Sequence, residues 1–280
     1  MVEIILKKII ASSSGVRVIR MELKSPEVAK KALAGQFVVL MVYEKGERIP
    51  LTIVDKDEDK GTITLIFQEV GLTTRLLGNL KEGEFLYSLT GPLGNPTDIK
   101  NYEKIVLIGG GVGIAEIYPV AKALREENKH ITTILGVRTK DLLILEKELR
   151  ELSDELYITT DDGSYGRKGF VTDVLSTMIS DNNRLSRIDL VYAVGPIPMM
   201  KKVSQITKDK GIKTIVSLNA LMVDGTGMCG CCRVTVNGET KFSCIDGPEF
   251  EAHQIDWEEL EKRNKMYQDK ETHICKLNNL

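Results

Sequence analysis

Four cysteines lie close together late in the 280-residue chain, at a spacing that could hold a metal ion. The segment reads Asp224-Gly-Thr-Gly-Met-Cys229-Gly-Cys231-Cys232, and Cys244 follows shortly afterwards. Thiolates are ligands for zinc and for iron–sulfur clusters, whereas a disulfide framework would distribute cysteines along a small secreted chain. The clustering therefore favours a metal site.

The residues between the last two clustered cysteines predict a β-hairpin. Asn237-Gly238 suits the two central positions of a type I′ turn, both of which need a positive φ. Counting outward from a two-residue turn places Cys232 opposite Ser243, so that Cys244 emerges beside Cys232. The glycine-rich loop before Cys232 allows the backbone to curl closely around whatever the thiolates hold.

Three kinds of site fit this segment. A [2Fe-2S] cluster needs four ligands, and Cys229, Cys232 and Cys244 supply three thiolates. A structural zinc site would use cysteine and histidine, but the three histidines of the chain form no obvious paired knuckle. Thiols buried by coincidence would not need the glycine-rich loop. The [2Fe-2S] cluster is favoured.

The fourth ligand of such a cluster would be Cys231 or an oxygen. Adjacent cysteines rarely chelate together comfortably, so Cys231 is predicted to be a neighbour of the cluster. Asp224 stands five residues before Cys229 and completes an x4, x2 spacing with Cys229 and Cys232. The predicted metal ligands are therefore Asp224, Cys229, Cys232 and Cys244.

Composition excludes several classes of partner. The chain has 38 basic and 40 acidic residues, for a net charge of -2, which gives no footprint for nucleic acid or an anionic membrane. Its longest uncharged stretch, residues 85–97, contains glycine and proline and is too short to span a bilayer. Glu3, Lys7 and Lys8 do not suit a signal peptide. A cytoplasmic protein with neither a nucleic-acid nor a membrane partner is expected.

The first hundred residues predict a small antiparallel β-barrel. Short segments rich in Val, Ile and Leu alternate with turns, and the charge run 55–60 suits a solvated hairpin tip. The predicted strands cover residues 3–11, 16–23, 36–43, 50–54 and 62–67.

After the Pro/Gly cluster at 91–96 the pattern changes to strands that alternate with helices. This alternation predicts a doubly wound α/β domain with a parallel sheet. The predicted strand and helix pairs are 104–108 with 113–126, 131–137 with 140–152, 156–159 with 169–179, and 190–194 with 199–208.

Four domains follow from these patterns. We expect a barrel over 1–97, an α/β domain over 98–216, a cluster-binding domain over 217–250 and a C-terminal tail over 251–280. The tail is charged and predicted to be helical over 257–270, and Cys275 within it is expected to be a bystander.

The predicted strand 104–108 runs into a glycine-rich turn and a helix start, which is how a pyrophosphate is held against free N–H groups. Later strand ends bring further loops to the same edge of a parallel sheet, where ligands bind. The predicted nucleotide-binding residues are Gly110, Gly111, Val112, Gly113, Ile114, Gly136, Arg138, Thr160, Asp161, Asp162, Gly195, Pro196 and Met199.

These motifs together resemble a known group of oxidoreductases. The cysteine spacing resembles that of the electron-transfer subunit of type B dihydroorotate dehydrogenase, with Asp224 in the place of the first cysteine. An Asp with three cysteines resembles the small subunit of NADH-dependent ferredoxin:NADP+ oxidoreductase, the electron-bifurcating transhydrogenase also described as archaeal sulfide dehydrogenase. Cys231 departs from the pattern, which has glycine there. The strand-end loops resemble the nicotinamide domain of the ferredoxin reductase superfamily.

The barrel resembles the FAD domain of the same superfamily. That resemblance implies an FAD site built from a strand edge, from hydroxyl groups and from backbone N–H groups. The residues that match it are Arg48, Pro50, Leu51, Thr52, Phe67, Gln68, Gly71, Thr73 and Thr74.

The resemblance implies a function as well as a fold. It implies hydride exchange between NAD(H) and FAD, and transfer of single electrons through a [2Fe-2S] cluster to a larger flavin and iron–sulfur subunit in a heterodimer. It favours NAD(H), although Arg138 and Lys140 could meet the 2′-phosphate of NADP(H). The alternatives are the electron-transfer subunit of dihydroorotate dehydrogenase and, in a different class, a zinc-stabilised nucleotide-binding regulator.

Overall fold

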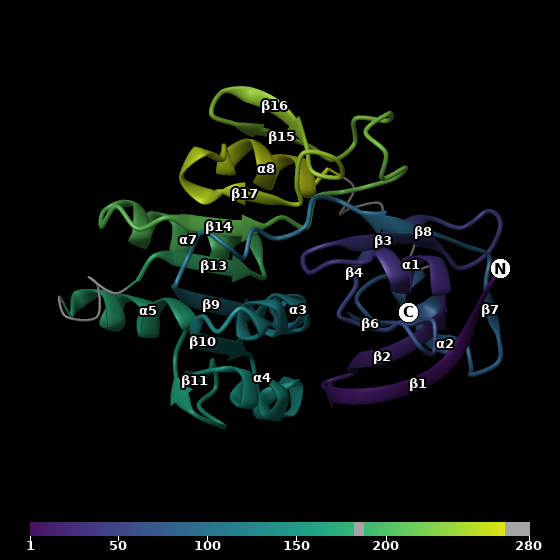
Figure 1. The fold of residues 1–280 in the computed structure, drawn as a ribbon, viewed down its shortest axis with the longest axis horizontal. Coiled ribbons are helices and arrows are strands. Elements are labelled where there is room, and N and C mark those ends of the chain that lie inside the picture. Colours follow the sequence, from purple (N-terminus) through teal and green to yellow (C-terminus); the bar gives the residue numbers. More distant parts are fainter. Residues whose placement is uncertain (182–187, 267–280) are drawn as a thin grey trace. The chain divides into compact units, whose positions relative to one another are not determined.

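The computed structural model describes residues 1–181 and 188–266, which form two compact units (Figure 1). Of the described residues, the barrel unit contains 1–95, 220–248 and 256–266. The sheet unit contains residues 96–219 and 249–255. Among the described helices, none has both the length and the apolar character needed to cross a membrane.

Within the described residues, the barrel unit consists of antiparallel strands and three helices. The strands are β1 (Val2–Ser13), β2 (Val16–Lys24), β3 (Phe37–Met41), β4 (Arg48–Thr52), β5 (Asp55–Asp57), β6 (Thr62–Gln68), β7 (Phe85–Leu86), β8 (Ser88–Leu93), β15 (Arg233–Val236) and β16 (Glu239–Phe242). The helices are α1 (Pro26–Lys31), α2 (Leu72–Asn79) and α8 (Trp257–Asn264). The sheet orders are β5-β6-β2-β1-β7, β4-β3-β8 and β15-β16.

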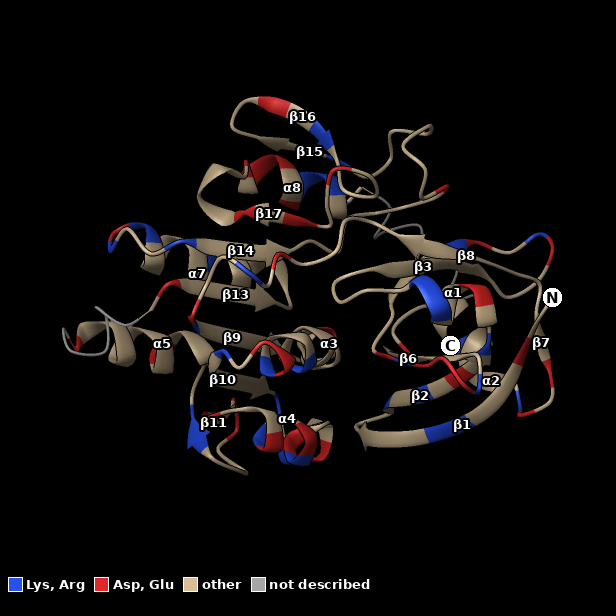
Figure 2. Ribbon diagram, viewed as in Figure 1, with Lys and Arg blue, Asp and Glu red and all other residues tan. Residues whose placement is uncertain are grey.

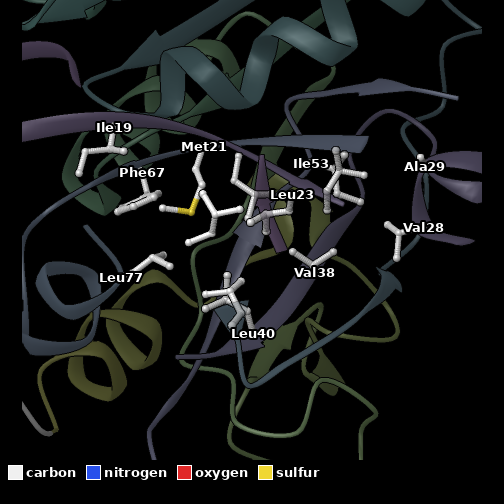
Figure 3. Packing of buried hydrophobic residues seen from close by; sticks show 14 of the residues in the cluster. Ile19, Met21, Leu23, Val28, Ala29, Val38, Leu40, Ile53, Phe67 and Leu77 are labelled. Atoms are coloured by element: carbon white, nitrogen blue, oxygen red, sulfur yellow. The ribbon is translucent and has the colours of Figure 1, made fainter. Parts of the chain in front are cut away.

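A hydrophobic core fills the barrel (Figure 3). Successive strand residues point to opposite faces, so the alternate residues Ile19, Met21 and Leu23 of β2 all lie in this core. Phe67 of β6 and Leu77 of α2 pack into the same cluster. The predicted antiparallel barrel is confirmed. The charge run 55–60, predicted to be a hairpin tip, forms strand β5 over residues 55–57, and only its second half forms the turn into β6.

Strand β3 serves two cores through its two faces. Val38 and Leu40 point into the barrel core. Phe37 and Val39 point the other way and pack against a second cluster that contains Cys232. The cysteine segment is therefore built onto the outer face of the barrel sheet.

The sheet unit is a doubly wound α/β domain, as predicted. Its strands are β9 (Lys104–Gly110), β10 (His130–Val137), β11 (Glu155–Thr160), β12 (Arg167–Lys168), β13 (Leu190–Val194), β14 (Thr214–Ser217) and β17 (Glu249–Glu251). Helices α3 (Gly113–Glu126) and α4 (Glu146–Leu152) contact each other, as do α5 (Val171–Ser180) and α7 (Ile197–Lys208), on either side of the sheet (Figure 1). Two 3-10 turns, η1 (Lys140–Leu142) and η2 (Ala252–Gln254), complete the described elements.

The strand order β12-β11-β10-β9-β13-β14-β17 contains a topological switch point. The chain runs from β9 outward through β10 and β11 and then returns to the other side of β9 as β13. All pairs from β12 to β14 are parallel, and only β17 is antiparallel. The carboxyl ends of β9 and β13 therefore flank the crevice where open α/β sheets bind ligands.

A buried polar group anchors β17 in the sheet unit. Glu249 accepts hydrogen bonds from the Tyr192 hydroxyl at 2.7 Å and from the Thr97 hydroxyl at 2.5 Å. Burial raises the pKa of the Glu249 carboxyl. Burial likewise raises the pKa of the Tyr192 hydroxyl, so that Tyr192 remains a hydrogen-bond donor. These bonds hold the chain in the sheet unit where it returns from the cysteine segment.

The single helix predicted over 140–152 is wrong. The segment forms η1 and then α4, separated by Leu145 with a φ of 53°. Ile144 is buried at 3% exposure, and the bend that buries it interrupts the helix. Of the predicted tail helix 257–270, α8 covers residues up to Asn264; the part from 267 onward, with Cys275, lies outside the described residues.

Candidate cofactor sites

The hairpin that carries two of the cysteines has the predicted register. Val236 pairs with Glu239, and the two turn residues Asn237 and Gly238 have φ values of 51° and 76°. The Ser243 amide donates to the Cys232 carbonyl at 3.0 Å, which continues the ladder beyond the strands. The predicted type I′ geometry and the placement of Ser243 opposite Cys232 are confirmed.

Two thiols lie in contact at the base of this hairpin. The Sγ atoms of Cys232 and Cys244 are 3.2 Å apart, and each residue is 2% exposed. Burial, together with the neighbouring thiol, raises the pKa of Cys244 to about 12. Two buried thiols this close ionise together only when a cation lies beside them, as in a metal or iron–sulfur site. The donor chemistry of the pair fits such a group.

The remaining predicted ligands lie in the loop before the hairpin. The Asp224 carboxylate accepts from the Thr226 amide at 2.7 Å and from the Cys229 amide at 2.6 Å. The bond from Thr226 is the main reason that the pKa of Asp224 lies below its usual value. Cys229 is exposed and Cys231 is half-buried.

The structure thus brings Cys232 to Cys244, and Asp224 to the Cys229 amide. It does not close all four predicted ligands into one coordination sphere: within residues 1–181 and 188–266, no three Cys, His, Asp or Glu side chains are arranged to hold a metal ion. The Asp224 carboxylate instead organises its own loop.

The loop packs closely on the barrel. Gly225 has a φ of 76°, and a Cβ atom there would lie 2.8 Å from Leu93 and 2.9 Å from Val39. Only glycine combines this backbone conformation with this approach. The barrel sheet therefore supports the loop directly.

Helix α8 supports the loop from the other side. Arg263 donates to the Cys231 carbonyl at 2.9 Å, and Arg233 donates to the Gly230 carbonyl at 3.0 Å. The Asp256 amide, at the start of α8, donates to the carbonyl of Thr235 in β15 at 2.9 Å. Acidic residues begin α8 and basic residues end it, as the helix dipole favours (Figure 2). Sequence analysis did not find this support, because a charged helix gives no sign of what it contacts.

The predicted FAD residues lie on β4, at the end of β6 and at the start of α2. Strand β4 is the edge of its three-stranded sheet, so one side of its backbone is free of sheet partners among the described strands. Pro50, Leu51 and Thr52 are half-buried there, while Arg48 is exposed and donates to the Met41 sulfur at 3.4 Å. This free edge is what a flavin needs to lie against.

The turn into α2 is organised by its own hydroxyls. Thr74 Oγ1 accepts from the amides of Val70 and Gly71, each at 3.0 Å. The buried Thr73 hydroxyl donates to the Glu47 carboxylate at 2.5 Å. Both hydroxyls therefore shape the turn.

The end of β6 is less accessible than the turn. The Phe67 side chain is 2% exposed in the barrel core, so only its backbone could face a cofactor. Gln68, the next residue, is half-buried and ends the strand.

The predicted glycines of the sheet unit meet at the switch point. Gly111 follows β9 with a φ of 59°, and its amide donates to the carbonyl of Gly136 at 2.8 Å. A Cβ atom on Gly113 would lie 2.5 Å from the carbonyl oxygen of Val194 in β13. The start of α3 can therefore approach β13 only because position 113 lacks a side chain.

Residues after β13 complete this edge. The Met199 side chain lies against two glycines, Gly110 and Gly195. A Cβ atom on Gly110 would come 2.4 Å from the Met199 sulfur. Pro196 precedes α7 and is exposed, while Val112 is half-buried. Ile114 is fully buried, so only its backbone could contact a ligand.

Charged side chains gather at the ends of β10 and β11. Because Val137 pairs with Thr160, the exposed residues Arg138 and Asp161 follow as neighbours on adjacent strands. The Asp162 carboxylate is used within its own loop, where it accepts from the Ser164 amide and hydroxyl. Arg138 and Asp161 are thus the exposed charged residues that directly follow these two neighbouring strands.

The remaining predicted residues at this edge shape the loops. The buried Thr160 hydroxyl donates to the Tyr165 carbonyl at 2.7 Å. The Lys140 ammonium lies 5.1 Å from the centre of the Tyr165 ring, a cation–π contact.

Three buried side-chain atoms in the described residues lack a hydrogen-bond partner, and one belongs to each cofactor region. Buried polar atoms are nearly always satisfied, so an orphan of this kind points to a missing ligand. Arg75 Nε lies on α2, Thr139 Oγ1 follows Arg138, and Ser243 Oγ lies between β16 and Cys244. Sequence reasoning missed all three as site residues, because only burial marks them.

An antiparallel barrel, a doubly wound domain with its ligand edge at a switch point, and a thiol-rich loop together define an oxidoreductase of the ferredoxin reductase type. Family comparisons agree with this class. Residues 3–97 match the oxidoreductase FAD-binding domain, and residues 107–205 match the oxidoreductase NAD-binding domain. Residues 219–256 match the iron-sulfur cluster binding domain of dihydroorotate dehydrogenase B.

Comparisons with individual relatives define the family of the chain more closely. It is 50% identical over 247 residues to a dihydroorotate dehydrogenase B (NAD(+)) electron transfer subunit homolog from Thermotoga maritima, covering 88% of this chain and 86% of the relative. It is 37% identical to the dihydroorotate dehydrogenase B electron transfer subunit of a Geobacillus strain, covering 79% and 86%.

A solved structure of NADH-dependent reduced ferredoxin-NADP oxidoreductase, described for flavin-based electron bifurcation, matches with a TM-score of 0.89 at 48% identity. The match covers 96% of this chain and 95% of that chain. Ferredoxin-NADP+ reductase from Plasmodium falciparum, at 17% identity and a TM-score of 0.60, shares the fold.

The chain belongs to the family of dihydroorotate dehydrogenase B electron transfer subunits and their homologues. It is an oxidoreductase subunit with sites for FAD, NAD(H) and an iron–sulfur cluster. The iron–sulfur interpretation of the cysteines is therefore favoured over zinc.

Proposed function

We propose that this chain is the small subunit of a heterodimeric NADH-dependent ferredoxin:NADP+ oxidoreductase. The observation that carries the proposal is the full-length likeness to the structure of that enzyme, together with Asp224 in the place of a fourth cysteine. The larger subunit would hold the sites for ferredoxin and NADP(H). We place the pair in the cytoplasm, where clustered cysteines remain reduced.

Each region has a distinct task in this function. FAD exchanges hydride with NAD(H), and an iron–sulfur cluster, proposed here as [2Fe-2S], carries single electrons. The edge of β4, the α2 turn and Arg75 would hold the flavin and its pyrophosphate. The turn at Gly110–Ile114 and the loop at Gly195–Met199 would hold the nicotinamide nucleotide. Asp224, Cys229, Cys232 and Cys244 would ligate the cluster.

The surface of the cysteine segment supports a partner. Val223, Met228 and Ile245 are 43%, 89% and 46% exposed, although all three are apolar. Met228 lies directly before Cys229, which is itself exposed. An apolar surface beside a redox centre suits contact with the subunit that takes up the electrons.

Cofactor analysis of the purified protein tests the proposal. Protein made anaerobically with iron supplied is expected to contain about one FAD, two irons and two acid-labile sulfides per chain. Zinc in place of iron would overturn the redox function. Co-purification with the untagged partner, followed by analysis of the cofactors of that partner, then identifies the enzyme.

The electron-transfer subunit of dihydroorotate dehydrogenase is the second candidate, because several relatives carry that description. The activity of the partner subunit distinguishes the two candidate functions. A partner that reduces ferredoxin and binds NADP(H) supports the first proposal, and a partner that oxidises dihydroorotate supports the second.

Asp161 is predicted to select NAD(H) over NADP(H). Asp161 follows β11 at the position next to Arg138, which follows β10. A carboxylate there would repel a 2′-phosphate and would accept a hydrogen bond from a 2′-hydroxyl. Asp161→Asn is expected to raise kcat/KM for NADPH about tenfold, because about 1.4 kcal/mol of like-charge repulsion is removed. Steady-state reduction of a dye by NADH and by NADPH measures the change.

Asp162→Asn is the matched control. Its carboxylate is engaged by Ser164, so the ratio of NADPH to NADH activity is expected to change less than for Asp161. An unchanged ratio in Asp161→Asn, or a wild-type preference for NADPH that Arg138→Ala abolishes, would contradict the assignment.

A further inference from the structure

Ser243 has a hydroxyl group that the fold buries and leaves unbonded. Its exposure is 0%, and Ser243 Oγ has no hydrogen-bond partner. The backbone of the same residue is satisfied, since its amide donates to the Cys232 carbonyl at 3.0 Å. A buried hydroxyl without a partner costs free energy that alanine at this position would not. The hydroxyl group could therefore donate a hydrogen bond to an acceptor that is not part of the chain.

The hairpin shows which residues lie next to Ser243. The Ser243 amide bonds the Cys232 carbonyl across the hairpin, one step beyond the last paired residues, Arg233 and Phe242. Cys244 is the next residue in the chain, and its sulfur lies 3.2 Å from that of Cys232. Ser243 is therefore adjacent to both buried cysteines, to one across the hairpin and to the other along the chain.

The sulfur atoms of the two adjacent cysteines are possible acceptors for this hydroxyl. A neutral thiol is a weak acceptor, and the Cys232 thiol already donates toward the Cys244 sulfur. The thiolates and sulfides of an iron–sulfur cluster carry negative charge and accept hydrogen bonds far better. A bound cluster would therefore supply a hydrogen-bond acceptor for the Ser243 hydroxyl.

We propose that the Ser243 hydroxyl donates a hydrogen bond to a sulfur atom of the bound iron–sulfur cluster on the Cys232 side and thereby raises its reduction potential. This inference rests on the proposed cluster site. Reduction adds negative charge to the cluster, so a donor directed at a sulfur stabilises the reduced form more than the oxidised form. Ser243 is thus a positioning and tuning residue and is not a ligand.

The test compares Ser243→Ala with the wild-type subunit by EPR-monitored redox titration, with iron and acid-labile sulfide measured in the same samples. We expect full iron content and a cluster about tenfold harder to reduce, which corresponds to a potential lower by about 59 mV for one electron. Thr240→Ala is the matched control, because Thr240 lies on β16, the strand that leads to Ser243, but is exposed and paired with Thr235 toward the other end of the hairpin. It should leave the potential unchanged.

A second pair of variants separates the hydroxyl from the shape of the side chain. Ser243→Thr keeps the hydroxyl group. Ser243→Val has the shape of the threonine variant but lacks the hydroxyl group. The valine variant should have the lower potential, or should lose iron when the threonine variant keeps it. An unchanged potential in Ser243→Ala, or equal potentials or equal iron loss in the threonine and valine variants, would overturn the proposal. Absence of iron from the wild type would instead refute the cluster site itself.

Discussion

Cys244→Ser is expected to remove the iron–sulfur cluster, whereas Cys231→Ser is expected to leave its iron content intact. Cys244 and Cys232 are buried with their sulfurs 3.2 Å apart, so they form the closed side of the site. Cys231 is half-buried, and its carbonyl, through Arg263, takes part in the support of the loop. Serine lacks the soft sulfur donor that iron–sulfur chemistry requires.

Iron and sulfide assays with the visible spectrum measure the result. Transfer of electrons to the partner should fall at least a hundredfold in Cys244→Ser. NADH-dependent reduction of a dye that accepts electrons from the flavin should continue, because the proposed FAD and NAD(H) residues are unchanged and this reaction does not pass through the cluster. Cys231→Ser serves as the control for a serine in the same loop. Cluster loss in Cys231→Ser with retention in Cys244→Ser would reassign the ligands.

Much of the fold follows from local patterns. Short segments rich in Val, Ile and Leu, separated by turns, predicted the barrel strands, and strands alternating with helices predicted the parallel sheet. The Asn237-Gly238 turn predicted the register of the hairpin down to the placement of Ser243 opposite Cys232. Such features depend on residues that are close in sequence, which is why they can be read directly.

Features that depend on long-range packing were not predictable. Burial of Ile144 breaks the helix expected over 140–152, and nothing local marks that bend. The attachment of α8 to the cysteine loop through Arg263 joins segments whose sequences show only charge. Arg75 and Ser243 became candidates only when their buried, unpaired atoms were known.

At the cysteine site, too, some features could be predicted from the sequence and others could not. Spacing identified the thiols, and the structure confirms that Cys232 and Cys244 meet. Spacing could not show that Asp224 accepts hydrogen bonds from two loop amides, because this depends on the path of the backbone. Asp224 could therefore act as a ligand, as a cap of the loop, or as both, and the two roles call for different replacements.

Asp224 is predicted to be the fourth cluster ligand. Three cysteines leave one iron a ligand short, and Asp224 stands where the related electron-transfer subunits are expected to have a cysteine. Its two oxygens accept the amides of Thr226 and Cys229, but each carboxylate oxygen has a further lone pair. A single carboxylate can therefore hold the loop and bind iron at the same time.

Asp224→Cys and Asp224→Asn separate ligation from capping. A ligand role predicts that cysteine keeps the cluster with a shifted EPR signal and potential, because one inner donor has changed, while asparagine loses iron at least tenfold faster than the wild type. A cap role alone predicts the reverse order, because asparagine still accepts a loop amide and a thiol does so poorly, at a cost of about 1 kcal/mol. Iron retention during chelator challenge ranks the two variants. Retention by asparagine with loss by cysteine would leave Asp224 as a loop residue and would remove the main sequence argument for the ferredoxin:NADP+ oxidoreductase assignment.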